Sequence, residues 1–147
     1  MIIHVMGDGT VLSLIDCENY ASYIGDWDEP GRLRAHLLAE ARQQHIVAWG
    51  SGFEADWRVE VRHGITEQEG YRDFLAVIAC SSGVLHLANY DSLTMAAQFD
   101  DYEMPDEETA DYAIEVPKGL YKVRVVQLLT PDERSWDAHE DEPHFLL

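Results

Sequence analysis

The chemistry that this sequence could perform rests first on its two cysteines, Cys17 and Cys80, its strongest potential nucleophiles. Cys17 stands between Asp16 and Glu18, and neighbouring carboxylates raise the pKa of a thiol and suppress the reactive thiolate. The spacing does not match C-x-x-C, and two cysteines are too few for a disulfide framework. The pattern predicts two reduced, partly buried thiols and no cysteine catalysis. A disulfide would require Cα atoms within about 7 Å of each other.

Seven histidines are spread along the chain, and none belongs to an H-E-x-x-H motif. The densest group is His139-Glu140-Asp141-Glu142-Pro143-His144, which offers ligands to a divalent ion. A zinc site needs three or four ligands that converge, so a solvated acidic tail is the favoured interpretation. The acidic run Asp100–Glu108 lacks the glycine and the final glutamate of an EF-hand loop. We therefore expect no metal and no other cofactor.

Other catalytic patterns do not occur in the sequence. Ser51 lies in Gly50-Ser51-Gly52, which is not a G-x-S-x-G elbow. Gly7-Asp8-Gly9 precedes a predicted strand, whereas a phosphate cradle leads into a helix. With 28 acidic residues, paired carboxylates are unavoidable and do not by themselves indicate a glycosidase. No catalytic residue is assigned, and binding is favoured over catalysis.

The charge balance narrows the class of partner. The 147 residues include 28 Asp and Glu against 10 Lys and Arg, for a formal charge of −18. Nucleic acids and anionic membranes are bound through Lys and Arg, so neither is an expected partner. The field of an acidic protein instead attracts basic proteins. A protein of this charge can also occupy the nucleic-acid groove of a basic protein, because it presents a similar charge.

Two acidic segments are the predicted contact region. The loop Asp26–Glu29 has aromatic neighbours, and tyrosine and tryptophan are favoured interface anchors. The segment 100–115 carries eight acids and no base, and within it Asp100–Glu108 is predicted to be an exposed loop. The candidate partner-binding residues are Tyr23, Asp26, Trp27, Asp28, Asp100, Asp101, Tyr102, Glu103, Asp106, Glu107 and Glu108.

In size and charge the chain resembles bacterial immunity and inhibitor proteins, which cover the active groove of a basic toxin or nuclease. No diagnostic motif carries this likeness. It implies a protein-binding module of inhibitor type that acts on a basic partner. Two alternatives stay open: a small-molecule-binding or enzymatic domain with a pocket where the sheet meets the helix, and a structural subunit that forms a homo-oligomer.

The elements that position these residues begin with two helices. Pro30 suits a first helical turn, with Asp28 or Glu29 near the cap, and Leu33, Leu37 and Ala41 recur every four residues. This spacing predicts an amphipathic helix over about residues 30–42. A shorter helix is predicted over about 92–99, where Asp91 is a candidate cap.

Strands are predicted in the remainder of the chain from apolar runs and from alternation. Gly7-Asp8-Gly9 predicts an opening β-hairpin, and Ser81-Ser82-Gly83 predicts a second one. Phe74–Cys80 is nearly all apolar, which is typical of a central strand buried on both faces. The predicted strands are 2–6, 10–16, 45–49, 56–62, 74–80, 84–90, 112–116 and 120–129.

These elements predict an α+β fold, chiefly an antiparallel sheet or small sandwich built from hairpins. The 147 residues have the size of one globular domain, with an acidic tail from about residue 131, and 46% hydrophobic composition supports a packed core. The tail ends in Phe145-Leu146-Leu147, which we expect to dock on the fold. The N-terminus lacks a basic, then apolar, signal sequence, so we expect a cytoplasmic protein.

Overall fold

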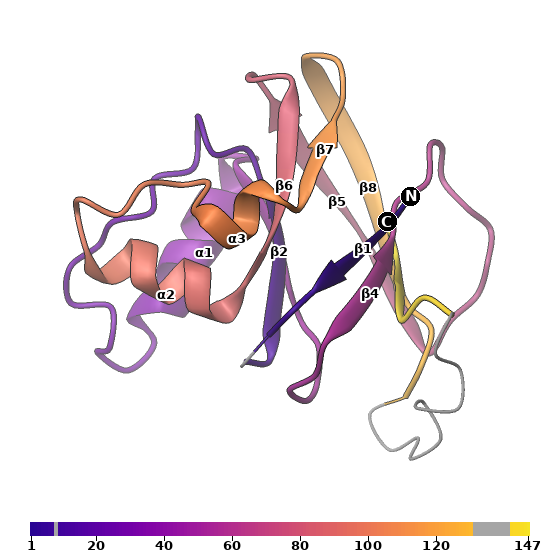
Figure 1. The fold of residues 1–147 in the computed structure, drawn as a ribbon, viewed down its shortest axis with the longest axis horizontal. Helices are drawn as coiled ribbons and strands as arrows, with labels where there is room; N and C mark the ends of the chain where they lie inside the picture. The colour runs from indigo at the N-terminus through magenta and orange to yellow at the C-terminus, as the bar shows by residue number, and fades with distance from the viewer. Residues whose placement is uncertain (8, 131–141) are drawn as a thin grey trace.

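The computed structural model describes residues 1–7, 9–130 and 142–147. Two β-sheets face each other, and helices lie beyond one of them (Figure 1). The five-stranded sheet has the order β1 (Ile2–Val5), β4 (Trp57–Glu60), β9 (Phe145–Leu146), β8 (Gly119–Gln127) and β5 (Arg72–Cys80). The four-stranded sheet has the order β3 (Ile46–Gly50), β2 (Val11–Ile15), β6 (Val84–Asn89) and β7 (Ala113–Glu115). The pairing is antiparallel apart from β4 with β9, which confirms the predicted α+β class.

The helices are α1 (Arg32–Arg42), α2 (Tyr90–Gln98) and the short α3 (Glu107–Ala110). They cover the outer face of the four-stranded sheet, where α1 packs against β3, and α2 and α3 pack against β6 (Figure 1). Both predicted helices are confirmed. None of the described helices combines the length and the apolarity that crossing a bilayer requires.

The caps of the two longer helices differ from the prediction. At α2 the cap is Asn89, whose side chain accepts a hydrogen bond from the Ser92 N–H at 2.9 Å, and Asp91 lies in the first turn. At α1 the cap is Gly31 in a left-handed conformation, with no side-chain cap bond. Glycine tolerates this backbone geometry because it has no Cβ.

The four-stranded sheet is the central layer of the molecule, because its two faces pack against different cores. Leu12 and Leu14 point into the core between the two sheets, together with Trp49, Trp57 and Phe145. The opposite face packs against the helices and forms a second core around Ile15, Ile46, Tyr20, Ala88 and Leu93. Side chains of successive strand residues point to opposite faces, so one short strand such as β2 supplies both cores.

Both predicted hairpins are wrong. β1 pairs with β4 in the five-stranded sheet, whereas β2 pairs with β3 and β6 in the four-stranded sheet. Likewise β5 pairs with β8, and β6 pairs with β2 and β7. The glycine-containing turns therefore carry the chain from one sheet to the other. A turn signal reports a change of direction and does not determine which strand becomes the partner.

Buried hydrogen bonds fix the turn after β5, where the chain passes from the five-stranded to the four-stranded sheet. The buried carboxylate of Asp16, at the end of β2, accepts hydrogen bonds from the Ser81 N–H at 2.5 Å and the Ser81 hydroxyl at 3.1 Å. These bonds outweigh the effect of burial and hold the pKa of Asp16 below its ordinary value. The end of β5 is thereby attached to the other sheet.

The prediction of a central strand at Phe74–Cys80 is also wrong. β5 is an edge strand of the five-stranded sheet, and its first half is exposed, with Leu75 at 64% exposure. Only the second half reaches the core, through Ile78 and Cys80. An apolar run indicates burial of some kind, but it cannot tell an edge strand beside another sheet from a central one.

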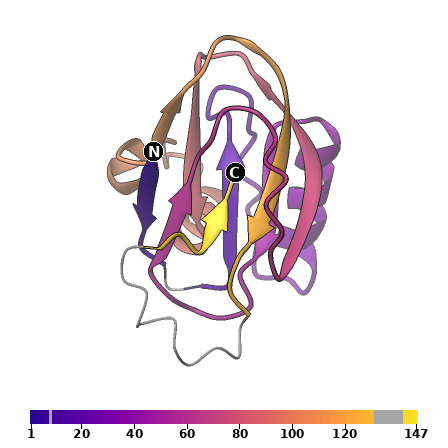
Figure 2. The ribbon, with the colours of Figure 1, turned by 90° about the vertical axis from the view of Figure 1, so that its right-hand side faces the viewer.

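The C-terminal residues close the five-stranded sheet, as the docking prediction implied. β9 lies between β4 and β8, parallel to the first and antiparallel to the second (Figure 2). Phe145 is fully buried, with ring centroids 5.9 Å from Trp49 and 5.2 Å from Trp57. The two-residue strand therefore contributes both backbone pairing and an aromatic centre to the core.

Truncating Phe145 should destabilise the whole fold. Phe145→Ala removes a buried ring from the centre of the sheet, and such a cavity costs about 3–5 kcal/mol. The free energy of unfolding, measured by urea titration, should fall by that amount. Leu120→Ala on β8 is the control, since that side chain is 64% exposed and its loss should have little effect. Equal losses in the two variants would contradict the role of β9.

Candidate functional site

The two predicted acidic segments meet at the C-terminal end of α2. The backbone N–H groups of Ile24 and Gly25 both donate to the carbonyl of Ala97, at 3.0 and 3.1 Å. The indole N–H of Trp27 donates to the side chain of Gln98 at 3.1 Å. Because Asp100 follows directly after this helix, the loop before α1 and the loop after α2 lie beside each other.

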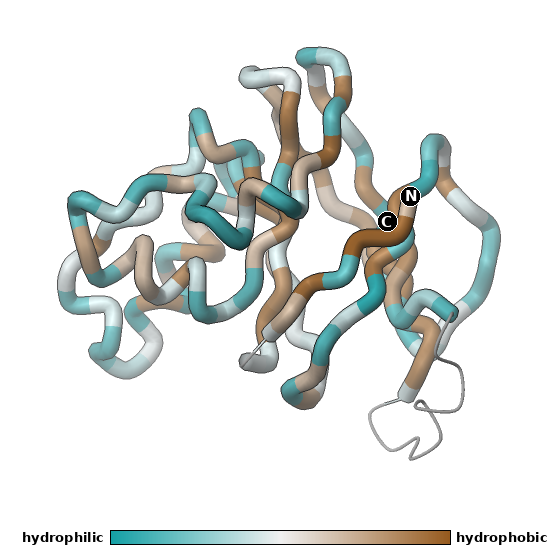
Figure 3. The backbone as a smooth tube through the Cα atoms, in the orientation of Figure 1, coloured by the Kyte–Doolittle hydropathy of each residue, from teal (hydrophilic) through white to brown (hydrophobic). Residues whose placement is uncertain are grey.

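We call this region, residues 23–29 and 100–108, the acidic end. Its loops lie at the left of Figure 1 and are largely hydrophilic in Figure 3. Most of the predicted contact residues are exposed there: Tyr23, Asp26, Asp28, Asp100, Asp101, Glu103 and Glu107. Their exposure suits contact with a partner, and their role in binding stays a prediction.

The segment predicted as an exposed loop, Asp100–Glu108, is in part an ordered structural element. Asp106 caps α3 by accepting from the Thr109 N–H at 2.7 Å, and it also accepts from the hydroxyls of Ser92 at 2.7 Å and Tyr102 at 2.5 Å. Burial favours a higher pKa for Asp106, but these hydrogen bonds outweigh it and hold the pKa below its ordinary value. The carboxylate thus ties the loop to α2.

Glu108, within α3, also ties this segment to its neighbours through hydrogen bonds. It accepts from the Tyr112 hydroxyl at 2.8 Å and from the Asn89 amide at 3.3 Å. Burial, reinforced by this carboxylate, raises the pKa of Tyr112 to about 12. Tyr102, Asp106 and Glu108 are therefore half-buried supports beneath the exposed acids. The sequence could not separate these three supporting residues from the exposed ones, because acids and tyrosine of both kinds follow one another within residues 100–108.

Replacing Asp106 by Asn should loosen the acidic end in a pH-dependent way. The folded pKa of Asp106 lies below the unfolded value of about 3.9, so its stabilising effect is full above that value and is lost as pH falls through the folded pKa. We expect Asp106→Asn to lower the free energy of unfolding at pH 7 by about 1–2 kcal/mol. The deficit should shrink below about pH 4.

Urea titrations from pH 3 to pH 7 test this expectation. The control is Asp101→Asn, which alters an exposed acid and should change the unfolding free energy by less than about 0.5 kcal/mol. A deficit for Asp106→Asn that stays constant over this pH range would contradict the assignment.

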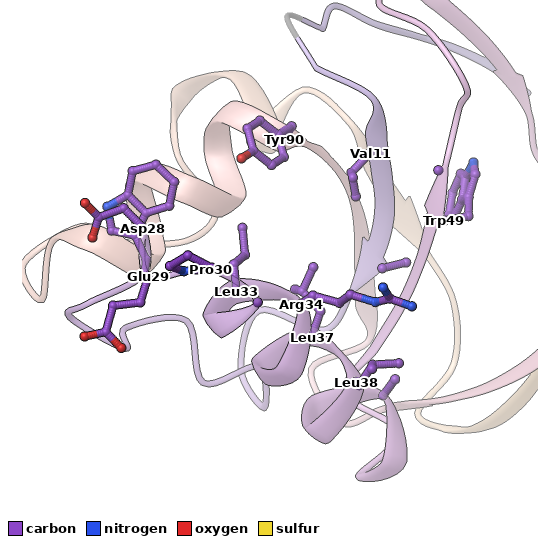
Figure 4. Close-up of a pocket in the computed structure, with 15 residues that line it drawn as sticks. Val11, Asp28, Glu29, Pro30, Leu33, Arg34, Leu37, Leu38, Trp49 and Tyr90 are labelled. Carbon is purple, nitrogen blue, oxygen red and sulfur yellow. The ribbon is translucent and has the colours of Figure 1, made fainter.

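An apolar groove begins at the acidic end and follows α1. It has a volume of about 670 Å³ and lies between α1 and a wall formed by β2, β3 and the start of α2 (Figure 4). Leu33 and Leu37 of α1 form one wall, and Val11 and Tyr90 face them. The predicted apolar stripe thus faces the sheet, yet no residue of α1 is fully buried.

The groove carries charges of both signs. Asp28 and Glu29 lie at the end that is shared with the acidic end (Figure 4). Arg34, on the first turn of α1, also lines the groove, and its guanidinium points towards β3 (Figure 4). The sequence signal for this groove is limited to the helical stripe, since the opposite wall comes from segments that are distant in the chain.

A second cavity, of about 610 Å³, lies where the two sheets separate. Leu14, Leu85 and Ile114 of the four-stranded sheet line it, opposite Tyr121 and Val123 of β8. Its mouth carries charged groups that are partly neutralised within the chain, such as Arg124, which pairs with Asp73 at 2.9 Å. The lining combines these apolar side chains with polar ones, among them His63, Thr66 and Glu115. The alternative of a small-molecule or enzymatic site was predicted for the junction of sheet and helix, whereas this cavity lies between the sheets.

The structure places Cys17 beside a histidine, which the sequence did not indicate. The sulfur lies 3.5 Å from Nδ1 of His86 on β6, 69 residues away in the chain. Burial, with the nearby carboxylates of Asp16 and Asp106, raises the pKa of Cys17 to about 12. Burial also lowers the pKa of His86 below its ordinary value. The pair is therefore a neutral thiol and a neutral imidazole at pH 7, whereas a cysteine nucleophile needs a thiolate.

Cys17 should consequently resist alkylation in the folded protein. With a pKa near 12, its thiolate fraction at pH 8 is lower than that of a free cysteine, and iodoacetamide should react at least about a hundredfold more slowly. Mass spectrometry of the peptide that contains Cys17 measures the rate. The same reaction in guanidinium chloride is the control and should proceed at the ordinary rate. Fast alkylation of the folded protein would contradict this account.

The remaining candidates from the sequence, Ser51 and the histidines of the tail, make hydrogen bonds that hold the fold together where the structure describes them. Ser51 is buried, and its hydroxyl donates to the Phe53 carbonyl at 2.8 Å. In the acidic tail, residues 139–141 lie outside the described part, while His144 is buried and accepts a hydrogen bond from the Arg58 N–H at 3.1 Å. Across residues 1–7, 9–130 and 142–147, no three His, Cys, Asp or Glu side chains converge as metal ligands.

Comparison with known proteins gives a likeness of fold. No family model matches the sequence, and no curated protein matches it. A solved structure described as crocagin biosynthetic gene J superposes with a TM-score of 0.59 at 15% identity, over 99% of this chain and 91% of that chain. ComJ from Bacillus subtilis, described as an inhibitor of the DNA-degrading activity of NucA, gives a TM-score of 0.54 at 10% identity, over 99% and 91% of the two chains. This chain therefore has a fold like that of ComJ.

Proposed function

We propose that this protein binds a basic nucleic-acid-degrading enzyme through its acidic end and blocks the enzyme's active groove. The observation that carries the proposal is the meeting of two acidic segments without any base. Residues 23–29 and 100–108 contain no Lys or Arg, and hydrogen bonds from the first segment to Ala97 and Gln98 hold it beside the second. Their charge is therefore not neutralised within the surface that they form.

The charge pattern explains how such a surface would inhibit. An enzyme that degrades nucleic acid holds phosphates with Lys and Arg, so its groove is basic. Exposed carboxylates such as Asp100 and Asp101 offer that groove a substitute for phosphates. The charge also steers the two proteins together, which raises the association rate.

The supports beneath the acidic end favour tight binding. Asp106 and Glu108 accept hydrogen bonds from α2 and its surroundings, so the loop is ordered before a partner arrives. A preordered surface loses less conformational entropy on association than a flexible one. Asp100 and Asp101, at the start of the same segment, are both exposed.

Two further points support the proposal. ComJ, whose fold this chain resembles, is described as an inhibitor of a DNA-degrading protein. Cys17 and Cys80 are free thiols, which agrees with action in the reducing cytoplasm. Beyond these points the proposal rests on the acidic end alone, because an identity of 10% supports a likeness of fold and not of partner.

The test is affinity capture followed by measurements on the purified partner. The tagged protein should capture a basic nuclease from lysate in about 50 mM salt and lose it in about 300 mM salt, because exposed charges are screened. It should inhibit the purified enzyme. Asp100→Lys with Asp101→Lys should raise the Kd and the inhibition constant at least about tenfold.

The matched control is Glu67→Lys with Glu69→Lys, which makes the same change of net charge. Both glutamates are exposed and lie between β4 and β5, on the side of the molecule away from the helices (Figure 1). Equal weakening by the two double variants would indicate an effect of net charge alone and would contradict a binding site at the acidic end. Binding that is unchanged between the two salt concentrations would also contradict it.

A further inference from the structure

The apolar face of α1, beside the acidic end, is only partly covered by the rest of the fold. Leu33, Leu37 and Ala41 face the groove, yet every residue of α1 keeps some exposure. An amphipathic helix ordinarily buries such a stripe against the core. Leu38, which also lines the groove, is 49% exposed. The stripe on α1 therefore has more apolar surface than the sheet covers.

The groove and the acidic end are one continuous surface. Trp27 lines the groove with its ring while its N–H donates to Gln98 at the end of α2. Asp28 and Glu29 form the mouth of the groove and are exposed (Figure 4). A protein that covers the acidic end therefore lies next to this groove, so the same partner can reach both.

We propose that the groove receives a basic amphipathic helix of the partner, a hypothesis that rests on the proposed function. Its apolar side chains would pack between α1 and the Val11–Tyr90 wall, and a Lys or Arg at one end would meet Asp28 and Glu29. Helices bind in apolar grooves in this way, through anchors spaced three or four residues apart.

The dimensions fit such a segment. α1 has 11 residues, which corresponds to a length of about 16 Å and to a partner helix of about three turns. A volume of about 670 Å³ accommodates a few large aliphatic or aromatic side chains. Asp28 and Glu29 lie at one end of the groove, so the basic residues of the partner helix are expected at that end (Figure 4).

Filling the groove tests this inference. Ala41 lines the groove, whereas Ala39 lies on the exposed face of the same helix, so Ala41→Phe and Ala39→Phe form a matched pair. The probes are a 14-residue peptide of leucine and lysine with one apolar helical face, a scrambled peptide of the same composition, and the nuclease captured as described above. Leu38→Lys is a second groove variant, chosen because substitutions at exposed positions have little effect on stability.

The expected result is at least about tenfold weaker binding of the amphipathic peptide and of the nuclease to Ala41→Phe and Leu38→Lys. Binding to Ala39→Phe should match the wild type, and the scrambled peptide should bind at least about tenfold more weakly than the amphipathic one. Circular dichroism confirms that each variant is folded.

Other results would overturn the inference. If Asp100→Lys with Asp101→Lys weakens nuclease binding while Ala41→Phe and Leu38→Lys do not, the proposed function stands and the groove is not part of the interface. If no variant changes nuclease binding, both proposals fail. If native mass spectrometry finds a small molecule that the wild type retains and Ala41→Phe loses, the groove is a ligand pocket and the partner helix is excluded.

Discussion

The buried side chain of Asn89 joins the end of β1 to the helices α2 and α3, and the arrangement of the acidic loops depends on this junction. Its carbonyl oxygen caps α2, and its amide donates to the Met6 carbonyl at 2.7 Å and to Glu108 at 3.3 Å. One buried amide therefore connects the end of β1, the start of α2 and the short helix α3. A buried polar group is stable when such partners satisfy it, so these contacts favour the joint placement of the three segments.

The acidic end follows from that placement. α2 presents the carbonyl of Ala97 and the side chain of Gln98, which bind the loop before α1, and it leads directly into the second acidic segment. Repulsion among so many carboxylates opposes their assembly. Hydrogen bonds to Asp106 and Glu108 offset part of that repulsion, because they keep two of the acids inside the structure as acceptors. The other acids of this region, among them Asp100 and Asp101, stay exposed at the surface.

The groove beside α1 shows how the two cores differ. The core between the sheets is filled by large aromatic side chains, among them Trp49, Trp57 and Phe145, and is closed by β9. The core under the helices is smaller, and α1 contributes only partly buried side chains to it. Packing therefore leaves space in both cores, as a cavity where the sheets separate and as the groove next to the acidic end. Exposed apolar surface of the second kind often marks an interaction site.

The sequence by itself determined the fold class, the two longer helices and the strongly acidic surface, because periodicity and composition are local properties. The stripe Leu33–Leu37–Ala41 sets α1, and the segments without bases are visible in the printed residues. Only the tertiary structure decided which strands pair, since a turn such as Ser81–Gly83 fits a hairpin and a crossing between sheets equally well. It also decided that the two acidic segments meet, that Asp106 supports the loop, and that Cys17 lies beside His86. Those outcomes depend on contacts between residues far apart in the chain, for which no local pattern carries information.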